Sequence, residues 1–124
     1  MPVCRLELTD NISLSKPTLQ KFFVELHQMM VELIDTSLES CKSYVSVAGT
    51  HCTADGNPRH GFAMLGIQIL PGRDHDLQAK LKNRAGEMLV ELLNQAEIDI
   101  RIQARVLITE VDLALYYMAD VGGK

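Results

Sequence analysis

An internal repeat constrains the fold of this 124-residue sequence more than any other feature. Residues 30–34 (MVELI) match residues 89–93 (LVELL) at a separation of 59 positions. The same shift places the alternating segment that begins near residue 3 on the one that begins near residue 62. It also places the segment at residues 43–50 on the one at about 100–110. Because each copy has the pattern of a strand, a helix and a second strand, the sequence predicts a duplicated β-α-β unit.

Two segments have the apolar spacing of helices that bury one face. In residues 17–35, and again in residues 74–96, large apolar side chains recur at steps of three and four residues. Asp74 or Asp76 is the expected cap of the second helix, since an aspartate oxygen can accept from the free N–H groups of a first helical turn. The apolar stripes of both helices are expected to form the core.

Alternating apolar and polar residues predict four strands, over residues 3–8, 43–50, 62–70 and about 100–110. The turn residues at 54–58 (ADGNP) predict a hairpin from the second strand to the third. Within each unit the strands would be parallel and joined by a right-handed helical crossover. The expected fold class is therefore α+β, with one four-stranded sheet and two helices on one face.

The third predicted strand, residues 62–70, is apolar on both faces apart from Gln68. A strand of this kind needs cover on both sides of its sheet. Because both helices are expected on the same side, the other face would stay bare. A symmetric oligomer is the simplest way to cover it.

Composition and charge exclude several classes of protein. The formal net charge is −4, the 12 basic residues are scattered, tryptophan is absent and aromatics make up 5%, so nucleic-acid binding is not expected. No apolar run approaches the ~20 residues that cross a bilayer, and the first residues do not resemble a signal peptide. We therefore expect a cytoplasmic protein without membrane association. The length fits a single domain over residues 1–124, with repeats over 1–56 and 57–124.

The cysteines and histidines follow no pattern that predicts a site. Cys4, Cys41 and Cys52 are an odd count without C-x-x-C spacing, so we expect no disulfide framework and three buried, small apolar side chains. The histidine and cysteine spacings match no metal-ligand pattern, so no metal is expected. The sequence also lacks a glycine-rich phosphate loop and the G-x-S-x-G motif, which leaves nucleotide binding and serine hydrolysis without support.

Two residues carry candidate chemistry. If Met1 is removed, the nitrogen of Pro2 becomes a secondary amine at the edge of the sheet, a base whose ring and following strand restrict its motion. Arg73 follows Pro71 and Gly72, where a strand gives way to a helix and side chains often bind anions. The alternatives are an inert proline and a solvated loop arginine.

Several short motifs, in this order and spacing, resemble the tautomerase superfamily, and within it the 5-carboxymethyl-2-hydroxymuconate isomerase family. They are Met1-Pro2, ELTDNI at 7–12, ADG at 54–56, Gly72-Arg73, and AGEML at 85–89 followed by Glu91-Leu92. The resemblance spans almost the whole chain. It implies a homotrimer in which three sheets form a central barrel, and this barrel would cover the bare sheet face.

The resemblance also implies an activity that needs no cofactor. In similar enzymes the proline nitrogen, here that of Pro2, takes a proton from the enol hydroxyl of a 2-hydroxymuconate-type dienol and returns one to a distant carbon. The product is the 2-oxo isomer, an intermediate in the breakdown of aromatic compounds. Arg73 matches an arginine that holds a substrate carboxylate, and Tyr117 falls where the family has an aromatic residue near the pocket.

Lys42 is a departure from the family pattern. It stands where these isomerases have an arginine, and Tyr44 replaces a second one. Lysine keeps the charge without the two-pronged geometry of a guanidinium group. We expect a small anionic substrate bound by Arg73, Lys42 and Tyr117. Two alternatives remain at this stage: a non-enzymatic module that binds a small carboxylate or another protein, and a different reaction on the same fold, such as the addition of water to an activated alkene.

Overall fold

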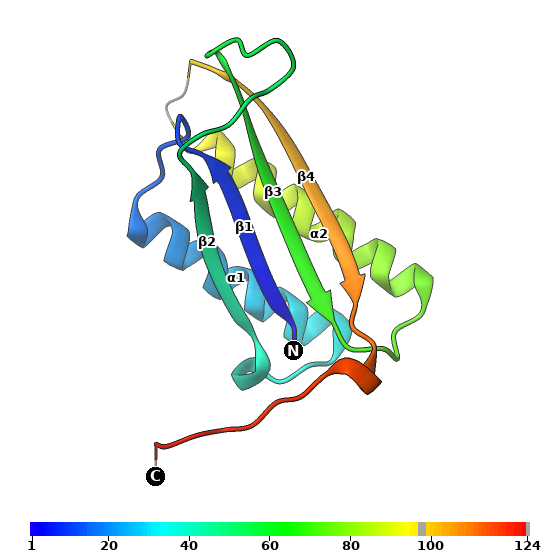
Figure 1. The fold of residues 1–124 in the computed structure, drawn as a ribbon. Coiled ribbons are helices and arrows are strands. Elements are labelled where there is room, and N and C mark those ends of the chain that lie inside the picture. Colours follow the sequence, from blue (N-terminus) through cyan, green and yellow to red (C-terminus); the bar gives the residue numbers. More distant parts are fainter. Residues whose placement is uncertain (97–98, 124) are drawn as a thin grey trace.

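The computed structural model describes residues 1–96 and 99–123. One sheet lies in front of two long helices, as Figure 1 shows. In chain order the elements are β1 (Val3–Thr9), α1 (Lys16–Ile34), the 3₁₀ helix η1 (Leu38–Ser40), β2 (Lys42–Ala48), β3 (His60–Ile69), α2 (His75–Asn94), β4 (Arg101–Glu110) and the 3₁₀ helix η2 (Leu113–Leu115).

The predicted duplication is confirmed by the order of the elements, and the starts of the helices and of the second strands follow the 59-residue shift. At a shift of 59 residues the first residue of α1, Lys16, corresponds to the first residue of α2, His75. The first residue of β2, Lys42, corresponds in the same way to the first residue of β4, Arg101. The predicted four-stranded sheet with both helices on one face is confirmed as well (Figure 1).

The strand order is β2-β1-β3-β4, and this order corrects one prediction. β1 pairs with β2 and β3 pairs with β4 in parallel, whereas the central β1 and β3 are antiparallel. The predicted hairpin is wrong, because β1 lies between β2 and β3. Residues 49–59 instead cross the end of β1, where the Asp10 N–H donates to the Ala48 carbonyl at 3.2 Å. The turn residues do form a turn, in which the Gly56 N–H donates to the Thr53 carbonyl at 2.9 Å, but a local turn does not choose the strand partner.

The core lies between the sheet and the two helices. Cys4, Leu6 and Leu65 are among the buried residues of the central strands, all on the face that the helices cover. The Asp74 side chain accepts from the Leu77 N–H at 2.8 Å, so Asp74 is the cap of α2. A cap of this kind stabilises a helix by about 1 kcal/mol.

The cysteine prediction is confirmed at two positions and wrong at the third. Cys4 and Cys41 are buried, but Cys52 is exposed because it lies in the crossing segment outside the sheet. The three cysteines are free thiols. In the part of the chain that the structure describes, no helix combines the length and the apolar content needed to span a membrane.

The face of the sheet opposite the helices carries exposed apolar side chains. Tyr44 is 49% exposed, Met64 38% and Leu107 67%. Beyond β4 the chain forms a single 3₁₀ turn, η2, and residues 116–123 then extend away from the sheet (Figure 1). Lys124 lies outside the described residues.

Candidate active site

Pro2 lies at the end of the sheet where β1 and β2 begin and where β3 and β4 finish. Its side chain is among those less than 2% exposed. The Pro2 carbonyl accepts a hydrogen bond from the Lys42 N–H at 3.1 Å, next to the β1–β2 ladder in which Val3 is the partner of Lys42. The main chain of the edge strand β2 therefore holds Pro2 in place at the start of the central strand β1.

Met1 decides whether Pro2 has a basic nitrogen. In the structure Met1 precedes Pro2, so the Pro2 nitrogen belongs to an amide and has no proton-accepting lone pair. The Met1 carbonyl accepts a hydrogen bond from the Thr36 hydroxyl, with 3.5 Å between the oxygen atoms. Thr36 is a residue that the sequence did not single out, since it follows a helix end and belongs to no motif.

Arg73 makes structural contacts that sequence reasoning missed. Its Nε and Nη2 donate to the Ile34 carbonyl at 3.2 and 3.0 Å, and Nη1 donates to the Leu70 carbonyl at 3.4 Å. Arg73 thus binds the last residue of α1, two positions before Thr36. Among the described residues these contacts use three of the five guanidinium N–H groups, so two are left for another acceptor. The Gln78 amide fixes the backbone of this segment by donating to the Arg73 carbonyl at 3.0 Å.

The other two predicted substrate-binding residues occupy different surroundings. The Lys42 ammonium group donates to the Glu39 carbonyl at 2.7 Å and stays exposed at the same end of the sheet as Pro2. Tyr117 is 90% exposed in the tail that leaves this end of the sheet (Figure 1). Within one chain the fold therefore gathers Pro2, Lys42 and Arg73 at one end of the sheet and leaves Tyr117 extended away from them.

Three titratable side chains near the start of β2, those of Cys4, Cys41 and His27, have pKa values shifted towards their neutral forms. Burial raises the pKa of the Cys4 thiol to about 12, and burial also raises the pKa of Cys41, although the positive N-terminus and Lys42 act in the opposite direction. The His27 ring and the Ser43 hydroxyl share a hydrogen bond of 2.6 Å. Burial is the main cause that lowers the pKa of His27, and the positive charge of Lys42 lowers it further. None of these side chains carries a negative charge that would favour a protonated amine.

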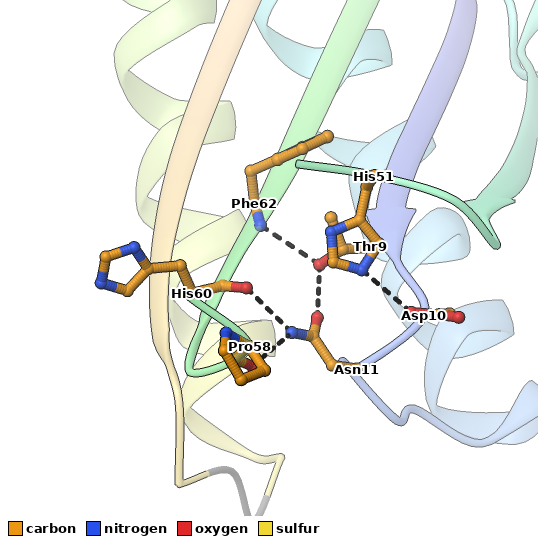
Figure 2. Close-up of polar contacts among 7 residues, drawn as sticks. All are labelled: Thr9, Asp10, Asn11, His51, Pro58, His60 and Phe62. Atoms are coloured by element: carbon orange, nitrogen blue, oxygen red, sulfur yellow. Dashed lines mark hydrogen bonds and ion pairs between the residues drawn. The ribbon is translucent and has the colours of Figure 1, made fainter. Parts of the chain in front are cut away.

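A second polar network lies at the opposite end of the sheet and holds the fold together (Figure 2). The Thr9 hydroxyl donates to the Asn11 side-chain oxygen at 2.6 Å and accepts from the Phe62 N–H at 3.2 Å. The Asn11 amide donates to the His60 carbonyl at 2.9 Å. The ELTDNI motif thus ties the end of β1 to the start of β3. Across the described ranges, no three histidine, cysteine or acidic side chains gather as metal ligands.

Known structures share this fold. No protein-family model matches the chain, and no curated protein matches its sequence. A fused 4-OT wild-type asymmetric trimer is similar to the chain, with a TM-score of 0.75 and 15% identity, over 94% of this chain and 92% of that one. Pt0534 inactivated by 2-oxo-3-pentynoate has a TM-score of 0.71 and 17% identity, over 94% of this chain and 91% of that one. The chain therefore has the tautomerase-type fold that the resemblance implied.

Within this class, a 5-carboxymethyl-2-hydroxymuconate isomerase from Deinococcus radiodurans R1 is similar to nearly the whole chain. The TM-score is 0.83, and the match covers 97% of this chain and 90% of the isomerase at 19% sequence identity. The similarity establishes the arrangement of β1, α1, β2, β3, α2 and β4.

Proposed function

We propose that this protein is a cofactor-free isomerase, a keto-enol tautomerase in which the nitrogen of Pro2 transfers the proton. The proposed substrate is a 2-hydroxymuconate-type dienol, with 5-carboxymethyl-2-hydroxymuconate as the first compound to test. The observation that carries the proposal is the position of Pro2, buried and held by Lys42 at the end of a central strand. The sequence resemblance and the fold shared with the Deinococcus isomerase support it.

The reaction consists of two proton transfers. The Pro2 amine takes the proton of the enol hydroxyl, which leaves a dienolate and a positively charged prolinium. The prolinium then returns a proton to a distant carbon of the dienolate, and the product is the conjugated 2-oxo acid. No oxidant, metal or cofactor takes part in these steps.

The amine must be unprotonated near neutral pH for the first step to occur. An α-amino group titrates at about 7.7 to 8.0, and a secondary amine is intrinsically more basic. Burial of the Pro2 ring and the positive charges of Arg73 and Lys42 favour the neutral amine. The raised pKa values of Cys4 and Cys41 keep both thiols uncharged, so they do not oppose this effect.

We further propose that three chains assemble through the uncovered sheet faces. Exposed Tyr44, Met64 and Leu107 on that face favour such an assembly, since large exposed apolar surfaces mark sites of association. The tail also carries exposed apolar side chains, and a neighbouring chain would cover them and place Tyr117 near another subunit's Pro2. A fused 4-OT of similar fold is a trimer. Light scattering in solution tests the assembly, and the mass of a single chain would contradict it.

The activity test needs protein whose N-terminus is verified by intact mass. Ketonisation of the dienol, followed by ultraviolet absorbance, should be at least about 100-fold slower in Pro2→Ala than in the Met1-free wild type. Pro17→Ala, at an exposed position in the first turn of α1, is the matched control and should keep wild-type activity. Equal rates for the wild type and Pro2→Ala would refute the role of Pro2. A natural chain that retains Met1 would favour the non-enzymatic binding module instead.

A further inference from the structure

The Thr36 hydroxyl donates a hydrogen bond to the Met1 carbonyl. The two oxygen atoms lie 3.5 Å apart. In any amide the carbonyl oxygen lies about 2.3 Å from the nitrogen, as bond lengths dictate. The Thr36 hydroxyl oxygen is therefore no more than about 6 Å from the Pro2 nitrogen.

At this separation one oxygen atom of a ligand can form hydrogen bonds to both the Pro2 amine and the Thr36 hydroxyl. Hydrogen bonds between oxygen and nitrogen or oxygen atoms have lengths of about 2.8 Å, so an atom placed between Pro2 and Thr36 can reach each of them. The Met1 carbonyl oxygen lies between the two groups, 3.5 Å from the Thr36 hydroxyl oxygen and in the same amide as the Pro2 nitrogen. Once Pro2 is the first residue of the mature chain, Thr36 no longer has this acceptor, and its hydroxyl faces the space beside the amine.

The surroundings of Thr36 suit an anionic ligand. Thr36 is half-buried, so its hydroxyl is partly withdrawn from water. Arg73 binds the Ile34 carbonyl two residues earlier and brings a positive charge to the same turn. The β-branched side chain of threonine has few rotamers, so little freedom is lost when its hydroxyl binds a ligand.

We propose that Thr36 donates a hydrogen bond to the 2-oxygen of the substrate, the atom whose proton moves to Pro2. This inference rests on the proposed function and assigns a further residue to its site. As the proton leaves, negative charge develops on the 2-oxygen, and a donor aimed at this atom stabilises the transition state more than the bound substrate. Thr36 would therefore act on kcat more than on KM.

Three variants of Met1-free protein test the assignment. Thr36→Val keeps the shape and removes the hydroxyl, and should lower kcat about 10- to 100-fold with KM changed less than about threefold. Thr36→Ser keeps the hydroxyl and should stay within about threefold of wild type. Thr50→Val makes the same change at an exposed loop position and should behave as wild type. Thermal unfolding confirms that each variant is folded.

A second measurement separates failure of this assignment from failure of the proposed function. 2-Oxo-3-pentynoate carries the same 2-oxygen beside an electron-poor alkyne. The Pro2 nitrogen adds to the far alkyne carbon, a carbon–nitrogen bond replaces one π bond, and the amine proton passes to the neighbouring carbon. The chain therefore gains the whole mass of the reagent, which mass spectrometry detects at Pro2.

Each outcome bears on the assignment. Slower labelling in Thr36→Val than in wild type and Thr36→Ser supports it, even if no dienol is isomerised and the proposed function fails. Labelling and turnover that are the same in Thr36→Val and wild type overturn it. A wild-type chain that is neither labelled nor active overturns both the assignment and the proposed function.

Discussion

Replacing Gly61 with alanine should weaken the fold by overpacking the network at the end of β1. A Cβ atom at this position would lie 2.7 Å from the Thr9 hydroxyl oxygen and 2.8 Å from the Asn11 side-chain oxygen. Thr9 is fully buried and bonded to Phe62, so it has no space into which it can move. Overpacking typically costs about 1–3 kcal/mol, and a displaced Asn11 would lose a further hydrogen bond of about 1 kcal/mol.

Alanine should offset this cost by about 0.5–1 kcal/mol, because glycine in a strand loses more backbone freedom on folding, so the net loss in the free energy of unfolding should be about 1–3.5 kcal/mol. Urea unfolding followed by circular dichroism measures this loss, at one protein concentration for all variants because association shifts apparent stability. Gly86→Ala is the control. Its new Cβ would meet only Val106, at 3.9 Å, and alanine in the middle of α2 should add about 0.5–1 kcal/mol. A Gly61→Ala protein as stable as wild type would refute the structural role of the network.

Arg73→Ala should lower the free energy of unfolding by about 1–2 kcal/mol, because the Ile34 and Leu70 carbonyls lose their donors, and should raise KM for the dienol. Lower stability with an unchanged KM would restrict Arg73 to its structural contacts. In the native protein at pH 8 a thiol reagent should modify Cys52 alone, and rapid reaction of two or three thiols would contradict the burial of Cys4 and Cys41. Because burial raises the pKa of Cys4 from 9.0 to about 12, the unfolded thiol ionises first, so stability should fall as pH rises from 9.0 towards 12 in alkaline unfolding experiments.

The sequence was sufficient for the features that depend on local pattern. The 59-residue repeat and the two apolar periodicities predicted both helices and all four strands, and Asp74 was one of two expected caps. The predicted hairpin was wrong because local backbone preferences determine only that a turn forms at Gly56. The strand that pairs with β3 is determined by which edge of the sheet is free, and this is the edge of β1.

The contacts of the candidate site could not be derived in this way. Arg73 and Thr36 bind the carbonyls of Ile34 and Met1, and every residue has a carbonyl whatever its side chain. Sequence patterns report side chains, so they do not reveal which main-chain group a distant donor will meet. Pro2 could be proposed from the sequence because a proline next to the first residue becomes a secondary amine once Met1 is removed, whatever the rest of the fold.

The duplication within a single chain limits the number of free main-chain amines to one. At a shift of 59 residues Pro2, which immediately precedes β1, corresponds to Gly61, the second residue of β3. A main-chain amine is free only at the N-terminus of a chain, and two separate half-length chains would each present one. In a single continuous chain the second copy begins inside the polypeptide, where its nitrogen is an amide. That position carries glycine here, and its lack of a side chain makes room for Thr9 and Asn11. Joining the halves in one chain thus leaves one free main-chain amine at most, whereas the equivalent position of the second copy is packed against Thr9 and Asn11.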